Sequence, residues 1–167
     1  MLARLLPLTY EHIEIIRNWR NQEYVREMME YREIISPTEQ ENWFKQLKDG
    51  ENKYYVITDK ENEYVGLINL KNITLDCAES GLFIGNPNYL GTGIAYSASI
   101  ALLNIAFFEL KLKNIVAKVN VNNVEAILYN ETLGFKIKAK LNKEFIQMEI
   151  DEESFDRSIK IILKAIK

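Results

Sequence analysis

The sequence predicts one α/β (α+β) domain built around a mixed β-sheet, and three observations support this fold class. Two segments with helix-start signals come first, and three strand-like segments follow them. A strand, an apolar helix and a β-branched strand then follow in succession, an order that favours a parallel strand pair joined by a right-handed crossover. The 167 residues contain no repeat, low-complexity tract or linker, so we assign residues 1–167 to a single domain.

Helix-start signals define the elements near the N-terminus. Thr9 is a candidate N-cap with apolar residues at helical spacing after it, and this helix should end near residue 21. The stretch "SPTE" places a capping Ser36 before Pro37 at the first helical position and Glu39 at the third, which is a capping box. We therefore expect a second helix over residues 36–48.

Strand-like segments are rich in β-branched and aromatic residues. "KYYVITD" and "EYVGLINLKNI" flank the short polar turn "KEN" and are expected to form a hairpin. In the last segment the run "SIKII" favours a strand over a helix, so we expect a closing hairpin there. The predicted strands are 53–59, 63–73, 77–85, 114–121, 135–149 and 154–164. The apolar helix after the third strand should bury Ile94, Ala98, Ala101, Leu102, Ile105 and Phe108.

Composition argues against several functions. A net charge of −3 without a basic cluster disfavours nucleic-acid binding. One histidine and one cysteine, Cys77, cannot build a clustered metal site, so no metal is predicted. Cys77 also permits no internal disulfide, which fits a reducing compartment. We see no signal peptide and no apolar stretch near the ~20 residues of a membrane span, so we expect a cytoplasmic location and no membrane partner.

The stretch "NYLGTGIAYSA" (88–98) places Gly91 and Gly93 at the start of the apolar helix. Glycine weakens a helix, so the pair indicates either a turn that needs unusual backbone angles or a ligand that approaches the backbone closely. A helix N-terminus offers unpaired N–H donors and partial positive charge, which suit a phosphate group. No G-x-x-x-x-G-K-[ST] or G-x-G-x-x-G pattern is present, which argues against the simplest nucleotide-hydrolysis and dinucleotide sites.

The element order, together with "YLGTGIA" and "NVEAILYNETLGF", resembles the GCN5-related N-acetyltransferase (GNAT) superfamily over essentially the whole chain. The resemblance implies a mixed sheet of about seven strands, mostly antiparallel with one central parallel pair, and about four flanking helices. It also implies that acetyl-CoA is the cofactor and that the backbone of the glycine turn holds its pyrophosphate. The family pattern Gln/Arg-x-x-Gly-x-Gly/Ala falls on Leu90, Gly91, Thr92, Gly93, Ile94 and Ala95, and Leu90 departs from it.

The second motif reads Asn-x-x-Ala-x-x-x-Tyr-x-x-x-Gly-Phe in this family, and its tyrosine protonates the departing CoA thiolate. Counting back four residues from Gly134 reaches Asn130, whereas Tyr129 lies one residue early, or about 100° round the helix. We interpret Asn130 as occupying the place of the acid, where it would bind the sulfur without transferring a proton, and we favour packing over catalysis for Tyr129. Asn122 is the predicted cap of this helix. The matching positions are Asn123, Ala126, Gly134 and Phe135.

In the strand "CAESGLFIG", the resemblance places the pantetheine arm of the cofactor beside Phe83 and Ile84. Relatives often carry a carboxylate on this strand, so Glu79 is a candidate general base for the acceptor amine, acting directly or through one water. The alternative is a carboxylate that faces outward from the strand. Cys77 has no obvious activating partner, so we expect direct attack in a ternary complex rather than an acyl-enzyme.

The helix "IIRNWRNQEYVREMM" resembles the first helix of nucleotide-sugar N-acetyltransferases, notably the one that acts on a UDP-linked 4-amino-4,6-dideoxy sugar in pseudaminic acid synthesis. The resemblance places Arg20 and Asn21 at the nucleotide-sugar pocket, where a guanidinium suits a diphosphate. The alternative for Arg20 is an ion pair on the helix surface. Gln40 replaces a histidine of that relative. Other positions of the small-molecule pocket are Met29, Asn69, Lys71 and Phe83.

Two other functions stay open. The ribosomal-protein N-terminal acetyltransferase branch shares the fold and often lacks the tyrosine. A non-catalytic acyl-CoA-binding module would tolerate Asn130 in the place of the acid, although the intact glycine turn favours turnover. A homodimer through the sheet edge or the closing hairpin is common in the superfamily.

Overall fold

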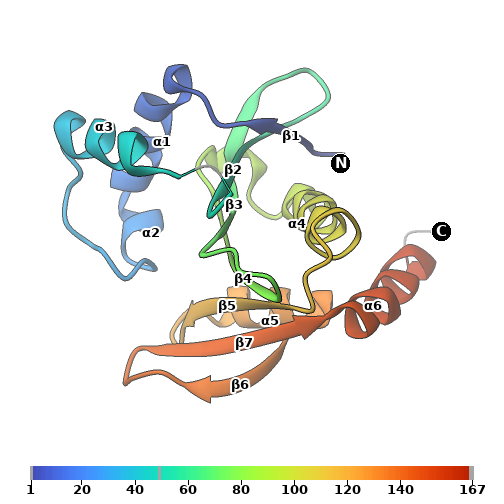
Figure 1. Cartoon of the computed structure of the whole chain (residues 1–167). Coiled ribbons are helices and arrows are strands. Elements are labelled where there is room, and N and C mark those ends of the chain that lie inside the picture. Colours follow the sequence, from blue (N-terminus) through green and yellow to red (C-terminus); the bar gives the residue numbers. More distant parts are fainter. Residues whose placement is uncertain (1, 49, 166–167) are drawn as a thin grey trace.

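The computed structural model describes residues 2–48 and 50–165. Among these residues, seven strands form one mixed sheet in the order β1-β2-β3-β4-β5-β7-β6, with β4 and β5 parallel and all other neighbours antiparallel (Figure 1). This confirms the predicted sheet. No described helix combines the length and apolarity needed to cross a membrane. The elements are β1 (Arg4–Pro7), α1 (Ile13–Asn21), α2 (Glu23–Arg26), α3 (Pro37–Gln46), β2 (Lys53–Thr58), β3 (Tyr64–Lys71), β4 (Cys77–Ile84), α4 (Ile94–Asn104), β5 (Asn114–Asn120), α5 (Val124–Leu133), β6 (Lys136–Lys140), β7 (Phe145–Asp151) and α6 (Glu152–Ala165).

Apolar clusters cover both faces of the sheet, because successive residues of a strand point to opposite sides. Val56 of β2 packs with Ile16 and Trp19 of α1, whereas its neighbour Ile57 belongs to the larger cluster around α4. Figure 1 shows α1, α2 and α3 on one side of β2 and β3 and α4 on the other. The inner strands are therefore buried between two helical layers.

The helix-start signal at residues 36–39 predicted the start of α3 correctly. Ser36 caps α3 with its hydroxyl accepting from the Glu39 N–H at 3.3 Å, and the Glu39 carboxylate accepts from the Ser36 N–H at 2.7 Å. This confirms the capping box, although α3 ends at Gln46 rather than at residue 48. The sequence did not reveal β1, a four-residue strand that is defined by its pairing with β2 and not by a local sequence pattern.

The prediction of a strand over residues 154–164 was wrong, because this segment lies in α6. Phe155, Ile159 and Ile162 recur at helical spacing and pack against the main core. Asp151 starts the helix by accepting from the Ser154 N–H at 2.8 Å. An amphipathic period with a cap thus outweighs the local strand preference of "SIKII". The closing hairpin is β6 with β7. With α6 and the short α2, the described residues form six α-helices where about four were expected.

Two smaller predictions were also wrong. Asn123, not Asn122, is the N-cap of α5, because its Oδ1 accepts from the Ala126 N–H at 3.0 Å. A π-helical turn over Ile105–Glu109 extends α4 and shifts the phase of its buried face. As a result Phe107 is buried, whereas Phe108, predicted to face the core, is 40% exposed.

Candidate functional site

A cavity of about 1100 Å³ lies where β4 and β5 separate. The two strands pair only from Cys77 with Asn114 to Ser80 with Ala117. Beyond this point β4 continues to Ile84 and β5 to Asn120 without pairing to each other in the described sheet. Both facing edges therefore keep backbone donors and acceptors that an extended polar ligand can use.

Most of the predicted site residues lie around this cavity. Asn21, Thr92 and Ile94 do not line it. Ile94 is fully buried in the core. The predicted residues that line the cavity are Arg20, Met29, Gln40, Asn69, Lys71, Glu79, Phe83, Ile84, Leu90, Gly91, Gly93, Ala95, Asn123, Ala126, Tyr129 and Asn130.

The glycine turn lies at one end of the cavity, directly before α4. Gly91 and Gly93 have φ angles of 72° and 79°, and Gly93 is the N-cap of the helix. A Cβ atom at either position would meet no atom of the described residues within 4 Å, so the backbone conformation rather than crowding requires glycine. The first turn of this 11-residue helix has N–H groups without intrahelical partners. Open space before a helix N-terminus fits the pyrophosphate of a CoA molecule.

Tyr129 lines the cavity and is anchored to α4 by its hydroxyl. Its hydroxyl donates to the Ala95 carbonyl oxygen at 2.8 Å and lies 2.6 Å from Ser99 Oγ. Burial raises the pKa of this hydroxyl well above its ordinary value. Asn130, one position further along the helix, lines the cavity and donates from Nδ2 to the Ala126 carbonyl oxygen at 2.9 Å. The Tyr129 phenol is therefore packed against α4, and the Asn130 amide is fixed by its own helix.

Glu79 faces its neighbour Lys71 across β4 and β3. The Lys71 Nζ atom lies 2.9 Å from Glu79 Oε1, and both side chains line the cavity. Only 25% of the Glu79 side chain is exposed. Glu79 is thus a shielded carboxylate in the cavity wall, held by an ammonium group of the next strand.

Two buried donors at the other end of the cavity lack acceptors. Arg20 Nη1 and Asn69 Nδ2 have no hydrogen-bond partner among the described residues, and both side chains line the cavity. Burial lowers the pKa of the Arg20 guanidinium, which nevertheless stays protonated at neutral pH. A buried donor without a partner is costly, so this end of the cavity favours a ligand rich in acceptor oxygens.

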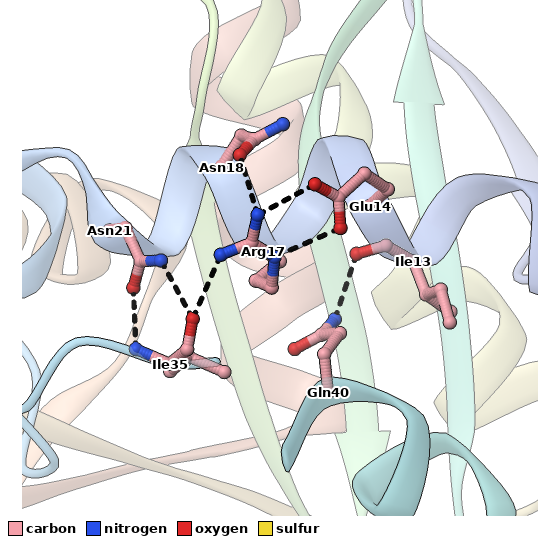
Figure 2. Close-up of polar contacts among 7 residues, drawn as sticks. All are labelled: Ile13, Glu14, Arg17, Asn18, Asn21, Ile35 and Gln40. Atoms are coloured by element: carbon pink, nitrogen blue, oxygen red, sulfur yellow. Dashed lines mark hydrogen bonds and ion pairs between the residues drawn. The ribbon is translucent and has the colours of Figure 1, made fainter. Parts of the chain in front are cut away.

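Figure 2 shows that Asn21 and Gln40 form hydrogen bonds to the main chain, Asn21 to Ile35 and Gln40 to Ile13. Asn21 donates from Nδ2 to the Ile35 carbonyl oxygen at 2.9 Å and accepts from the Ile35 N–H at 2.8 Å. Arg17 donates to the same carbonyl oxygen at 3.0 Å. Gln40 is buried and donates to the Ile13 carbonyl oxygen at 3.0 Å. These amides fix the chain between α1 and α3 beside Arg20.

Sequence reasoning missed an aromatic wall at the same end of the cavity. Trp43 of α3 and Tyr54 of β2 meet edge to face with ring centroids 5.2 Å apart, and both line the cavity. Tyr24 donates to the Gly85 carbonyl oxygen at 2.8 Å and so ties α2 to the end of β4. These residues come from separate elements, and their only sequence signal is their aromatic character, which also suits core packing.

The single cysteine takes no part in this arrangement. Cys77 is not among the residues that line the cavity. Burial and the nearby charge of Glu149 raise the pKa of its thiol. A thiol with a raised pKa is a poor nucleophile at neutral pH.

Comparisons with known proteins agree with this geometry. The Acetyltransferase (GNAT) domain family matches residues 3–136. The acetyltransferase PseH of Campylobacter jejuni is 29% identical over 131 residues, which are 78% of this chain and 81% of that protein. Spermidine N-acetyltransferase from Vibrio cholerae, solved with CoA and spermine, superposes with a TM-score of 0.84 at 23% identity, covering 92% of this chain and 97% of its own.

A domain from Methanocaldococcus jannaschii has a TM-score of 0.81 at 22% identity, covering 89% of this chain and 97% of its own. These structural similarities establish the fold, while the family match covers both sequence motifs up to the start of β6. The chain belongs to the GNAT family of acetyltransferases and is an acetyl-CoA-dependent N-acetyltransferase.

Proposed function

We propose that the acceptor is the 4-amino group of a UDP-linked amino-dideoxy sugar, acetylated by direct attack in a ternary complex. The observation that carries this proposal is the pair of buried donors, Arg20 Nη1 and Asn69 Nδ2, that lack acceptors among the described residues. A guanidinium binds diphosphate oxygens through paired hydrogen bonds, and a side-chain amide suits sugar or base oxygens. The sequence similarity to PseH supports the same choice.

The charged side chains that line the cavity include one guanidinium that is not neutralised by an ion pair with a described residue. Lys71 is paired with Glu79 at 2.9 Å and Lys118 with Glu30 at 2.6 Å, so these charges largely cancel. Arg20 makes no ion pair with another described residue and adds a positive charge to a partly desolvated wall. The same lining also carries the Glu39 and Glu125 carboxylates, so its summed charge does not exclude a polycation such as spermidine. The attraction of a diphosphate rests on Arg20 itself.

The proposed mechanism divides the work among three groups of this chain. Backbone N–H groups from Gly91 to Ala95 bind the pyrophosphate of acetyl-CoA, which supplies the acetyl thioester. Glu79 accepts the proton of the acceptor amine, directly or through one water. Asn130 donates a hydrogen bond toward the thioester sulfur, and a thiol of pKa near 8.5 leaves as a thiolate without a strong acid.

Ribosomal-protein N-terminal acetylation is a second candidate, favoured by one observation. Asn130, the residue that the motif spacing puts in the place of the catalytic tyrosine, lines the cavity, and the Tyr129 hydroxyl is bonded to the Ala95 carbonyl oxygen of α4. A homodimer through the sheet edge stays a prediction. The described sheet has two edge strands, β1 and β6, and β6 is exposed throughout and carries three lysines that disfavour strand pairing.

Thiol release from acetyl-CoA tests the proposal with three acceptors. These are the UDP-4-amino-4,6-dideoxy sugar, an N-terminal ribosomal peptide and spermidine. We expect release with the sugar nucleotide alone. Release only with the peptide or only with spermidine would contradict the proposed acceptor. Silence with all three, despite CoA binding by calorimetry, would also contradict it and would leave the cofactor cradle standing with a different amine as the acceptor.

A further inference from the structure

Asp59 is a buried carboxylate that the proposed mechanism does not use. It lies just after β2 and is 7% exposed. Its Oδ1 atom accepts from the N–H groups of Glu61 and Glu63, each at 2.9 Å, which closes the turn between β2 and β3. Its Oδ2 atom accepts from the Tyr89 hydroxyl at 2.8 Å, across 30 residues of sequence.

Tyr89 connects this carboxylate to the glycine turn. It ends the short 3-10 segment Pro87–Tyr89 and lines the cavity. Its carbonyl oxygen accepts from the Thr92 hydroxyl at 2.8 Å and from the Thr92 N–H at 3.3 Å. Tyr89 thus contacts Asp59 with its side chain and the turn with its backbone.

The turn needs such an anchor because glycine is the most flexible residue. Gly91 and Gly93 each lose more conformational freedom on ordering than any other residue would. A hydrogen bond to a charged carboxylate is roughly twice as strong as a neutral one. The same bond lowers the pKa of Asp59 and raises that of Tyr89, as a mutually stabilising pair should.

We propose that Asp59 and Tyr89 are positioning residues that hold the Gly91–Gly93 turn ready for the pyrophosphate of CoA. They act through the Thr92 contacts with the Tyr89 carbonyl oxygen and do not themselves react. This inference rests on the proposed cofactor cradle and is independent of the acceptor. Ordering the turn before binding removes a cost that the ligand would otherwise meet.

Calorimetric titration with CoA tests the inference without any acceptor. Tyr89→Phe and Asp59→Asn should each weaken CoA binding by about 3- to 10-fold, and the double variant should be no weaker than the weaker single variant. Tyr10→Phe is the matched control, because the Tyr10 hydroxyl donates to the Glu41 carboxylate at 3.1 Å and Tyr10 lies outside the cavity. This control should bind CoA as the wild type does.

Unchanged CoA affinity in Tyr89→Phe and Asp59→Asn, even with lower thermal stability, would overturn the inference, and so would multiplicative losses in the double variant. Gly93→Ala separates this failure from a failure of the cradle. If Gly93→Ala also binds CoA normally, the cradle is wrong and the inference falls with it. If Gly93→Ala weakens binding while Tyr89→Phe does not, the positioning role alone is wrong.

Discussion

The two ends of the cavity are built in different ways. At the proposed cofactor end, Gly91 and Gly93 shape the main chain through positive φ angles, and the helix that follows supplies backbone donors. At the proposed acceptor end, side chains from separate elements converge, with Arg20 from α1 and Asn69 from β3. Side chains at the acceptor end can therefore be exchanged without disturbing the backbone cradle, whereas the glycine turn depends on its φ angles.

The largest predicted effect concerns Glu79, the proposed general base. Glu79→Gln should lower kcat by about 100-fold or more with little change in the KM for acetyl-CoA, because general-base catalysis contributes about 10²- to 10⁴-fold. Steady-state kinetics across pH measures this change. Asp76→Asn is the control, since Asp76 also binds a lysine, Lys113, at 2.8 Å but does not line the cavity. Equal loss in both variants would make Glu79 a structural residue.

The cofactor end can be broken through its backbone. Gly93→Val forces a β-branched residue into φ 79°, a strain of about 1–3 kcal/mol, so CoA binding should weaken by about 5- to 100-fold. Gly50→Val is a matched control with φ 89° and similarly open surroundings outside the cavity. Calorimetry should show that the control keeps its CoA affinity despite a comparable loss of stability. Equal CoA affinity in the two variants would remove the turn from the cofactor site.

Smaller effects are expected at Asn130 and Tyr129, the two candidates for the group that interacts with the departing thiolate. Asn130→Ala should lower kcat by about 3- to 10-fold, the worth of one ordinary hydrogen bond to the sulfur. Tyr129→Phe should leave kcat within about two-fold and lower the free energy of unfolding by about 1 kcal/mol, because it removes the bond to Ala95. Denaturant unfolding and kinetics of the same preparations separate the two effects. A larger loss of kcat in Tyr129→Phe than in Asn130→Ala would make Tyr129 the acid.

The smallest predicted effect is a pH dependence at Asp59. The Tyr89 hydrogen bond holds the pKa of this carboxyl below its ordinary value, so its charge stabilises the fold above about pH 4 and this contribution fades as the pH falls toward the folded pKa. The Tm difference between the wild type and Asp59→Asn should be widest near pH 7 and narrow below about pH 4. Thermal melts across this range check the trend. A Tm difference that grows as the pH falls would contradict this role of the Asp59 charge.

The parts of the fold and site that could be predicted are those in which the local backbone requires a particular residue type. The Ser36 capping box and the glycines at 91 and 93 each need particular residue types at fixed spacing, so the sequence revealed them. By contrast, the bond between Asp59 and Tyr89 depends on tertiary packing and has no local signature. Residues 154–164 illustrate the same limit, because the helical period and the Asp151 cap outweighed β-branched propensity.

The acceptor end rests on Arg20, and calorimetric titration with UDP tests that claim most directly. With CoA present, the wild type should bind UDP, and Arg20→Gln should weaken this binding by about 10-fold or more while CoA affinity stays unchanged, because the guanidinium makes charge-assisted bonds to the diphosphate. No UDP binding by the wild type, or equal binding by the variant, would contradict the account of a cavity whose acceptor end recognises a sugar nucleotide.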